Sequence, residues 1–145
     1  MKRFRFPLAK VQRWRGQQER ESRRGLAIAL GELNRIDTAV AAVRSNLQAC
    51  QAGEMSAETE LARAITAGFE RAEQRLLAQR AVAEQAVQAM REQFLARRRD
   101  HLALRRLHDR RHEEWRAELV AAEQMEIEEL SRLQGDGRSS RRRTS

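Results

Sequence analysis

The sequence predicts an all-α protein, a long antiparallel two-helix coiled coil in the form of an α-helical hairpin. Three observations lead to this fold class. The first is composition: alanine, leucine, glutamate, glutamine and arginine dominate the 145 residues, aromatic residues make up 4%, and there is one proline. This profile is typical of long helices rather than of packed sheets. The other two are a pair of heptad-spaced apolar stripes and the single convincing helix break between them.

The first helix is expected to span residues 6–52, with Pro7 in its first turn, where the missing N–H costs nothing. Small and apolar residues alternate three and four positions apart along it: Leu26, Ala29, Leu33, Ile36, Val40, Val43, Leu47 and Cys50. A period of about 3.5 residues keeps one stripe facing a partner helix. The only cysteine, Cys50, lies in this stripe and is interpreted as a small core residue. It has no disulfide partner within the chain, which suits a reducing, cytosolic setting.

A turn is predicted at residues 53–56. Gly53 suits a left-handed helix C-cap, and Ser56, with glutamates following it, suits the N-cap of a second helix over residues 57–133. A second stripe runs along that helix at Leu76, Arg80, Ala83, Val87, Met90 and Phe94, preceded in a slightly shifted phase by Leu61, Ile65 and Phe69. Two long helices joined by a short turn must pack antiparallel.

A turn centred near residue 54 or 55 would place Val40 near Phe69 and Leu8 near His101. The second helix is the longer one, so from Arg105 onward it is expected to have no partner within the chain. Apolar residues nevertheless continue there, at Leu107, Trp115, Leu119, Ile127, Leu130 and Leu133. An isolated helix has no reason to keep such a face, so a partner protein is expected on it. Residues 1–134 are assigned to the hairpin, and 135–145 to a basic, disordered tail.

The formal net charge of +8 is concentrated near the ends, and residues 1–24 carry nine basic and two acidic side chains. Such ends favour anionic partners, whether nucleic acid, lipid headgroups or acidic protein surfaces. No window approaches the roughly 18 apolar residues of a membrane span, and the first residues lack the uninterrupted apolar core of a cleaved signal. Neither a transmembrane segment nor a secretory signal is therefore expected.

No enzymatic activity, cofactor or metal site is expected. Phosphate-binding loops need clustered glycines after a strand, and nucleophilic triads need a compact fold. His108 and His112 share a helix face, as a zinc-binding pair would, but Asp109 is shorter than the usual glutamate and nearby arginines would repel a dication. His101 lies too far along the axis to complete the same site. The paired histidines are interpreted as solvated or partner-facing polar residues.

Nucleic acid remains an alternative partner. Arginine clusters at 97–99, 105–106, 110–111 and 141–143 would neutralise phosphates, and such binding would weaken with salt. Acidic residues are interspersed through 97–116, however, and no base-reading motif accompanies them. Nucleic acid is therefore not the expected partner.

Two segments carry a resemblance to a known family. FRFPLAKVQRWRGQQERESRRGLAIALGEL, residues 4–33, resembles the start of FliJ, the small coiled-coil component of the flagellar type III protein-export apparatus. LALRRLHDRRHEEWRAELVAAEQMEIEELS, residues 102–131, resembles the C-terminal run of that family. Gln12, where an apolar residue is common, and the glycines of the first helix depart from the family pattern. The stalk protein of virulence-type secretion systems shares the architecture and remains an alternative.

The resemblance implies a fold similar to the coiled coil of the rotary ATP synthase gamma subunit. It implies a non-enzymatic role in bacterial flagellum biogenesis, protein transport and motility: binding the hexameric export ATPase and the membrane-embedded export gate, coupling ATP hydrolysis to export, and engaging export chaperones. The expected location is the cytoplasm, peripherally associated with the inner membrane at the flagellar base. The partner-binding residues expected for the ATPase ring are Phe4, Phe6, Leu8, Leu104, Leu107, Arg110, Arg111, Trp115 and Leu119.

Overall fold

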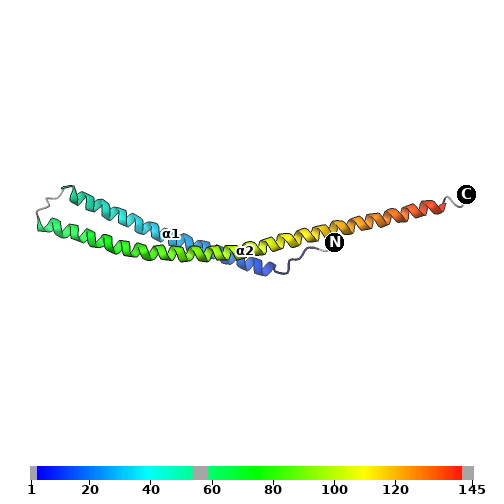
Figure 1. Cartoon of the computed structure of the whole chain (residues 1–145), viewed down its shortest axis with the longest axis horizontal. Helices are drawn as coiled ribbons and strands as arrows, with labels where there is room; N and C mark the ends of the chain where they lie inside the picture. The colour runs from blue at the N-terminus through cyan, green and yellow to red at the C-terminus, as the bar shows by residue number, and fades with distance from the viewer. Residues whose placement is uncertain (1–2, 54–58, 142–145) are drawn as a thin grey trace. The chain divides into compact units, whose positions relative to one another are not determined.

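The computed structural model describes residues 3–53 and 59–141 and contains two helices over those ranges (Figure 1). Helix α1 spans Ala9–Gln51 and α2 spans Glu60–Arg141. The described residues contain no strand, and the two helices pack against each other as a helical hairpin. The predicted all-α fold class is therefore confirmed. Over its described residues, neither helix has a stretch apolar enough to cross a membrane.

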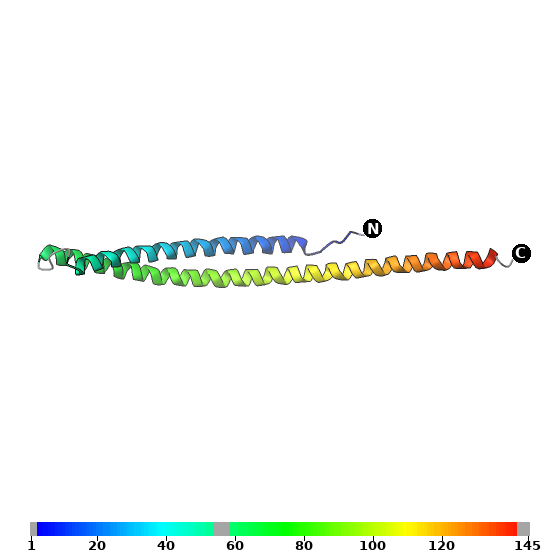
Figure 2. The ribbon, with the colours of Figure 1, turned by 90° about the horizontal axis from the view of Figure 1, so that it is seen from above.

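The contacts divide the chain into two compact units. Over the described residues, the hairpin unit consists of residues 14–53 and 59–101, and the terminal unit combines residues 3–13 with residues 102–141. Within the hairpin unit the two helices run side by side in both views (Figures 1 and 2). Both helices contribute residues to both units. The contacts of α2 in the hairpin unit and in the terminal unit are therefore described separately.

Helix α1 begins just after Pro7 rather than around it. The amide of Ala9 donates to the carbonyl of Phe6 (3.2 Å), which closes a turn around Pro7, and the amide of Gln12 then donates to Leu8 (2.8 Å). Proline favours the second position of such a turn because its φ is already fixed. The prediction of a helix from residue 6, with Pro7 inside its first turn, was therefore early by about three residues.

The seam of the hairpin unit follows the predicted stripe of α1. All eight stripe positions from Leu26 to Cys50 are buried or half-buried, and Val40 is 5% exposed. The predicted α2 positions from Leu76 to Phe94 are likewise at least half-buried. The covered stripe of α1 therefore faces the covered stripe of α2, which is the packing expected of a coiled coil.

One residue of the predicted α2 stripe was wrongly assigned. Leu61 is 70% exposed, and the neighbouring Ala62 is buried instead. Consecutive residues lie about 100° apart around a helix, so a phase error of one residue moves a side chain off the seam. The sequence showed a shift in the phase of the stripe before Leu76, and there the structure buries Ala62 in place of Leu61.

The register between the helices differs from the predicted one by about one heptad. Two cross-helix ion pairs flank Val40: Arg80 with Asp37 (2.6 Å) and Arg44 with Glu73 (2.6 Å). Val40 therefore lies opposite the α2 segment between residues 73 and 80, and not near Phe69. The reason is the connection between the helices, because α1 ends at Gln51 and α2 begins only at Glu60, where a four-residue turn was predicted.

Arg80 links the two helices through its guanidinium. Its hydrogen bond to Asp37 and the charge of that carboxylate raise its pKa further above the ordinary value, and Glu84 (2.6 Å) adds to this. An arginine at a seam position can keep its charged end in water while its aliphatic stem packs on the partner helix. This explains how a charged residue occupies the apolar stripe.

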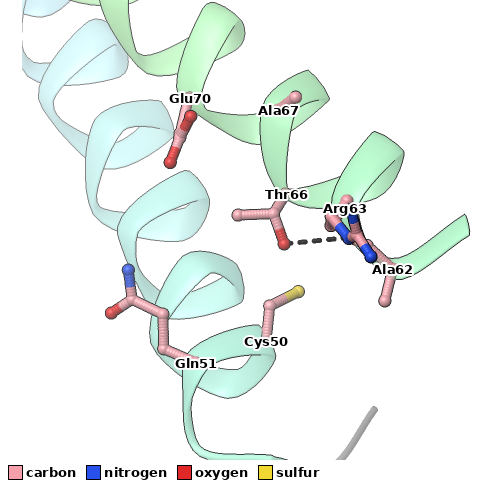
Figure 3. Close-up of a pocket in the computed structure, with 7 residues that line it drawn as sticks. All are labelled: Cys50, Gln51, Ala62, Arg63, Thr66, Ala67 and Glu70. Carbon is pink, nitrogen blue, oxygen red and sulfur yellow. Dashed lines mark hydrogen bonds between the residues drawn. The ribbon is translucent and has the colours of Figure 1, made fainter. Parts of the chain in front are cut away.

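The turn end of the hairpin unit confirms one predicted cap. Gly53 has φ of +86°, the left-handed conformation in which glycine has no steric cost. The proposed N-cap Ser56 and most of the predicted turn lie outside the described residues. Beside the turn, Cys50 projects from α1 towards α2 into a shallow depression next to Thr66, whose hydroxyl donates to the carbonyl of Ala62 (3.0 Å) (Figure 3).

At its far end α2 continues to Arg141, beyond the predicted helix end at 133. Residues 135–141 were assigned to a disordered tail, and that assignment differs from the helical backbone found there. Glycine costs a helix about 1 kcal/mol relative to alanine, but without proline the backbone can still form every helical hydrogen bond. Residues 142–145 of the predicted tail lie outside the described residues.

Candidate functional site

Five rings from distant parts of the sequence form one cluster in the terminal unit. We call Phe4, Phe6, His108, His112 and Trp115 the aromatic cluster. The ring of Phe4 lies 5.5 Å from His108, 5.1 Å from His112 and 5.8 Å from Trp115. Phe6 lies 5.1 Å from His108, and His112 lies 5.7 Å from Trp115. Ring centroids at these separations are in the range in which aromatic pairs attract each other.

Helical spacing explains how α2 presents its share of the cluster. Residues 108, 112 and 115 are four and three positions apart, so their side chains share one face of the helix. His108 and Trp115 continue, in the terminal unit, the seven-residue spacing of Arg80, Val87 and Phe94 on α2, and His112 lies one position out of that repeat. Their partner here is a short non-helical segment.

The opposite side of the cluster comes from the residues that precede α1. Residues 3–6 are non-helical, and their side chains alternate: Phe4 and Phe6 are half-buried, whereas Arg3 and Arg5 are exposed. Alternation with a period of two is what an extended segment produces when one side is covered. The turn around Pro7 then leads into α1. The F-x-F pattern therefore allows Phe4 and Phe6 to contact the same face of α2.

Arginines and glutamates surround an open depression beside Phe4 and Trp115. It is lined by Arg3, Phe4, Arg5, Pro7, Arg111, Glu114, Trp115 and Glu118. Arg111 is exposed and pairs with Glu114 at 3.3 Å. The lining combines two half-buried rings with exposed charged side chains, a composition that protein-binding surfaces also have.

The structure brings most of the predicted partner-binding residues together in the terminal unit. The ring of Phe4 contacts Trp115 and the ring of Phe6 contacts His108. Three further predicted residues are half-buried on α2: Leu104, Leu107 and Leu119. Leu8 is more open, at 38% exposed. Arg110 and Arg111 are exposed, so both guanidiniums are accessible to a partner.

The expectation that α2 lacks a partner from Arg105 onward was wrong for its first part. Phe4 and Phe6 cover it as far as Trp115, because the register is one heptad longer than predicted. From residue 120 to residue 134, by contrast, every side chain is exposed. The uncovered part of α2 therefore begins about two heptads later than the sequence suggested.

Of the two interpretations given for the paired histidines, solvated or partner-facing, the solvated one was wrong. His108 and His112 are half-buried in the aromatic cluster rather than solvated, and their rings are stacked at 6.3 Å. The signal that identifies them is their spacing from Trp115, since all three fall on one helix face. His101 is a separate case in the hairpin unit, where its Nδ1 lies 2.5 Å from Glu19 and its ring packs against Gly16.

The chemistry of these groups is that of binding surfaces. Over residues 3–53 and 59–141, no three His, Cys, Asp or Glu side chains are close enough together to hold a metal ion. The two imidazoles of the cluster contact rings, and Asp109 lies 3.1 Å from His108 at the edge. The groups at the cluster and its edge are thus suited to apolar contact and to ion pairing.

Comparisons with known proteins do not place the chain in a family. No family model matches the sequence, and no curated protein or solved structure does so either.

Proposed function

We propose that the protein is a non-enzymatic component of the bacterial flagellar protein-export apparatus that binds the hexameric export ATPase through its terminal unit. The sequence resemblance to the FliJ family motivates the proposal, and the helical hairpin fold is compatible with it. On this proposal the protein performs no chemistry itself. It helps to couple ATP hydrolysis to export through its contacts with the ATPase ring and the export gate.

The observation that carries the proposal is the contact between Phe4 and Trp115, at 5.8 Å. These residues belong to the two segments on which the resemblance rests, and more than a hundred positions separate them in the sequence. The antiparallel hairpin itself brings the two segments together, so the proposal depends on which residues meet there and not on the meeting alone. Their meeting at an aromatic cluster with exposed arginines supports a shared role.

The mode of binding follows from the chemistry of this surface. An aromatic side chain flanked by arginine is the usual composition of an interaction hot spot, because the ring buries a large area and the guanidinium forms directed ion pairs. We propose that Trp115 and Phe4 bury against the ATPase ring while Arg110 and Arg111 pair with acidic groups on it. The partner surface is then apolar at its centre and acidic at its edge.

The test is a binding measurement between the purified protein and the export ATPase of the same genome. The exposed pair Arg110→Ala and Arg111→Ala should weaken binding by about tenfold or more if both guanidiniums form ion pairs in the interface. Arg91→Ala, an exposed arginine of α2 in the hairpin unit, is the matched control and should leave binding unchanged. Swimming motility of the same variants should follow the same order.

Two results would reject the proposal. One is the absence of binding to the ATPase by the unaltered protein, and the other is equal binding by the control and the double variant. Binding to duplex DNA in the absence of ATPase, lost steeply with added salt, would instead support the nucleic-acid alternative. Binding only to the ATPase of a virulence-type secretion system would support the stalk-protein alternative.

The remaining roles belong to the same proposal. We propose contacts with the export gate and with export chaperones, and a cytoplasmic location at the flagellar base, peripherally associated with the inner membrane. Fluorescent tagging in motile cells tests the location: foci at flagellar bases are expected, and a uniform cytoplasmic signal would contradict it.

A further inference from the structure

A second heptad stripe runs along the exposed side of α2 in the terminal unit. Its first four positions are Leu102, Arg106, Asp109 and Glu113. Its last four positions are Arg116, Val120, Glu123 and Ile127. The intervals alternate between four and three residues throughout, which is the spacing of a coiled-coil seam. We call these eight positions the second seam.

The second seam is separate from the face that contacts Phe4 and Phe6. Leu102 is half-buried and the other seven side chains are exposed, with Val120 at 51% and Ile127 at 63%. His108, His112 and Trp115, by contrast, occupy the covered face. The helix thus carries one heptad stripe that is already packed and another that faces solvent.

When two copies of the second seam are aligned in opposite directions, basic positions of one copy fall opposite acidic positions of the other. Antiparallel coiled coils pair the first core position of one heptad with the fourth of the other. In that pairing Leu102 meets Ile127, Arg106 meets Glu123, Glu113 meets Arg116, and Asp109 meets Val120. One of the four pairs is apolar and two are oppositely charged, whereas Asp109 with Val120 sets a carboxylate beside an apolar side chain and adds no attraction. Two-fold symmetry makes each pair occur twice.

Flanking residues agree with the same alignment. Residues 102–111 carry four arginines and one aspartate, whereas residues 117–131 carry five glutamates and no basic residue. The antiparallel arrangement puts the basic stretch of one helix beside the acidic stretch of the other. A parallel arrangement would put acidic beside acidic and basic beside basic, and the repulsion between like charges opposes it.

We propose that a second copy of this chain binds the second seam, so that two α2 helices pair antiparallel about a two-fold axis between residues 114 and 115. The apolar contribution is small, since only Leu102 and Ile127 form an apolar layer. Most of the attraction is between opposite charges in partly solvated positions, so the association is expected to be weak and sensitive to salt. It does not depend on the proposed export function.

The experiment is sedimentation equilibrium of the full chain at low salt. The unaltered protein should show a monomer–dimer equilibrium, and raising the salt to about 0.5 M should weaken it by about tenfold, because exposed charges are then screened within a few ångströms. Arg106→Glu alone and Glu123→Arg alone should each weaken the dimer by about tenfold or more, since each puts like charges together in two symmetric layers.

The decisive variant combines Arg106→Glu with Glu123→Arg in one chain. It keeps the net charge and reverses both members of the pair, so it should restore the dimer to within about threefold of the unaltered protein, because charge pairing alone sets those layers. Arg91→Glu is the control for added acidity and should have little effect. All substituted positions are exposed, and circular dichroism verifies that each variant remains helical.

Three outcomes would overturn the proposal. The unaltered protein could remain monomeric at low salt. The single variants could dimerise as well as the unaltered protein, which would place the contact elsewhere. The combined variant could remain as weak as the single variants, which would show that Arg106 and Glu123 do not face each other across the dimer.

Discussion

The hairpin unit and the terminal unit use one heptad spacing on α2 for two different kinds of contact. In the hairpin unit the covered stripe is largely aliphatic and packs on another helix, with Val40 and Val87 buried. In the terminal unit the covered positions include rings of α2 that pack on a non-helical segment through Phe4 and Phe6. The first arrangement stabilises the fold. The second leaves arginines and an open depression at its edge, which is suited to binding.

The largest effect is expected where the aliphatic seam is tightest. Val40→Asp should cost about 3 kcal/mol or more, because it places a carboxylate without a partner in a buried position. Ile28→Asp, on the same helix at 74% exposed, is the matched control and should change stability by about 0.5 kcal/mol or less. Urea unfolding followed by circular dichroism measures both. Equal losses for the two variants would contradict the seam described for the hairpin unit.

A smaller and local effect is expected in the terminal unit. Phe4→Ala removes the ring that contacts His108, His112 and Trp115, and should cost about 1–2 kcal/mol, since the ring is half-buried and has three ring neighbours. Hydrogen exchange should become faster at residues 8–13 and remain unchanged around Val40. Arg3→Ala, exposed in the same segment, should do neither. Faster exchange throughout the hairpin unit would show that the two units do not behave separately.

Two glycines of α1 have different surroundings in the hairpin unit: Gly16 lies beside His101, and Gly31 faces open space. Gly31→Ala should stabilise the protein by about 0.5–1 kcal/mol, because alanine favours helix and nothing lies within 4 Å of the added methyl. At Gly16 the added carbon would lie 3.3 Å from Nε2 of His101, whose other nitrogen contacts Glu19. Gly16→Ala should therefore gain less than Gly31→Ala in thermal unfolding. An equal gain would mean that His101 moves away without cost.

The smallest effect is expected at the ion pairs on the surface of the seam. Arg80→Met keeps the aliphatic stem but removes the pairs with Asp37 and Glu84. Exposed ion pairs contribute little and are screened by salt, so the melting temperature should fall slightly at low salt and not at high salt. Arg80→Lys, which keeps the charge, is the comparison. A large loss that persists at high salt would contradict this account, because it would show that the guanidinium contributes more than a screened surface ion pair.

The sequence predicted the fold class and the α1 stripe because a heptad pattern directly encodes which side of a helix is covered. It could not set the register. A slip of one heptad keeps every stripe position on the seam, as it did for Val40, so the pattern is equally satisfied by either alignment. Only the length of the connection decides between them, and the predicted turn was several residues shorter than the interval between α1 and α2.

The candidate site was predicted in part. The aromatic and arginine residues were identified, and Phe4 and Trp115 do meet. His108 and His112 were not included, because imidazole is common both on surfaces and in cores and its burial depends on what covers the face. That covering segment was misplaced when the register was set one heptad short. The error about the histidines and the error about the uncovered part of α2 therefore have one cause.

The most direct test of the proposed role is hydrogen exchange of the full chain with and without the export ATPase. If the terminal unit is the binding surface, exchange should slow at residues 8–13 and 104–119, while residues 26–50 of the hairpin unit keep their rates. Protection confined to residues 26–50, or the same exchange with and without the ATPase, would contradict the account.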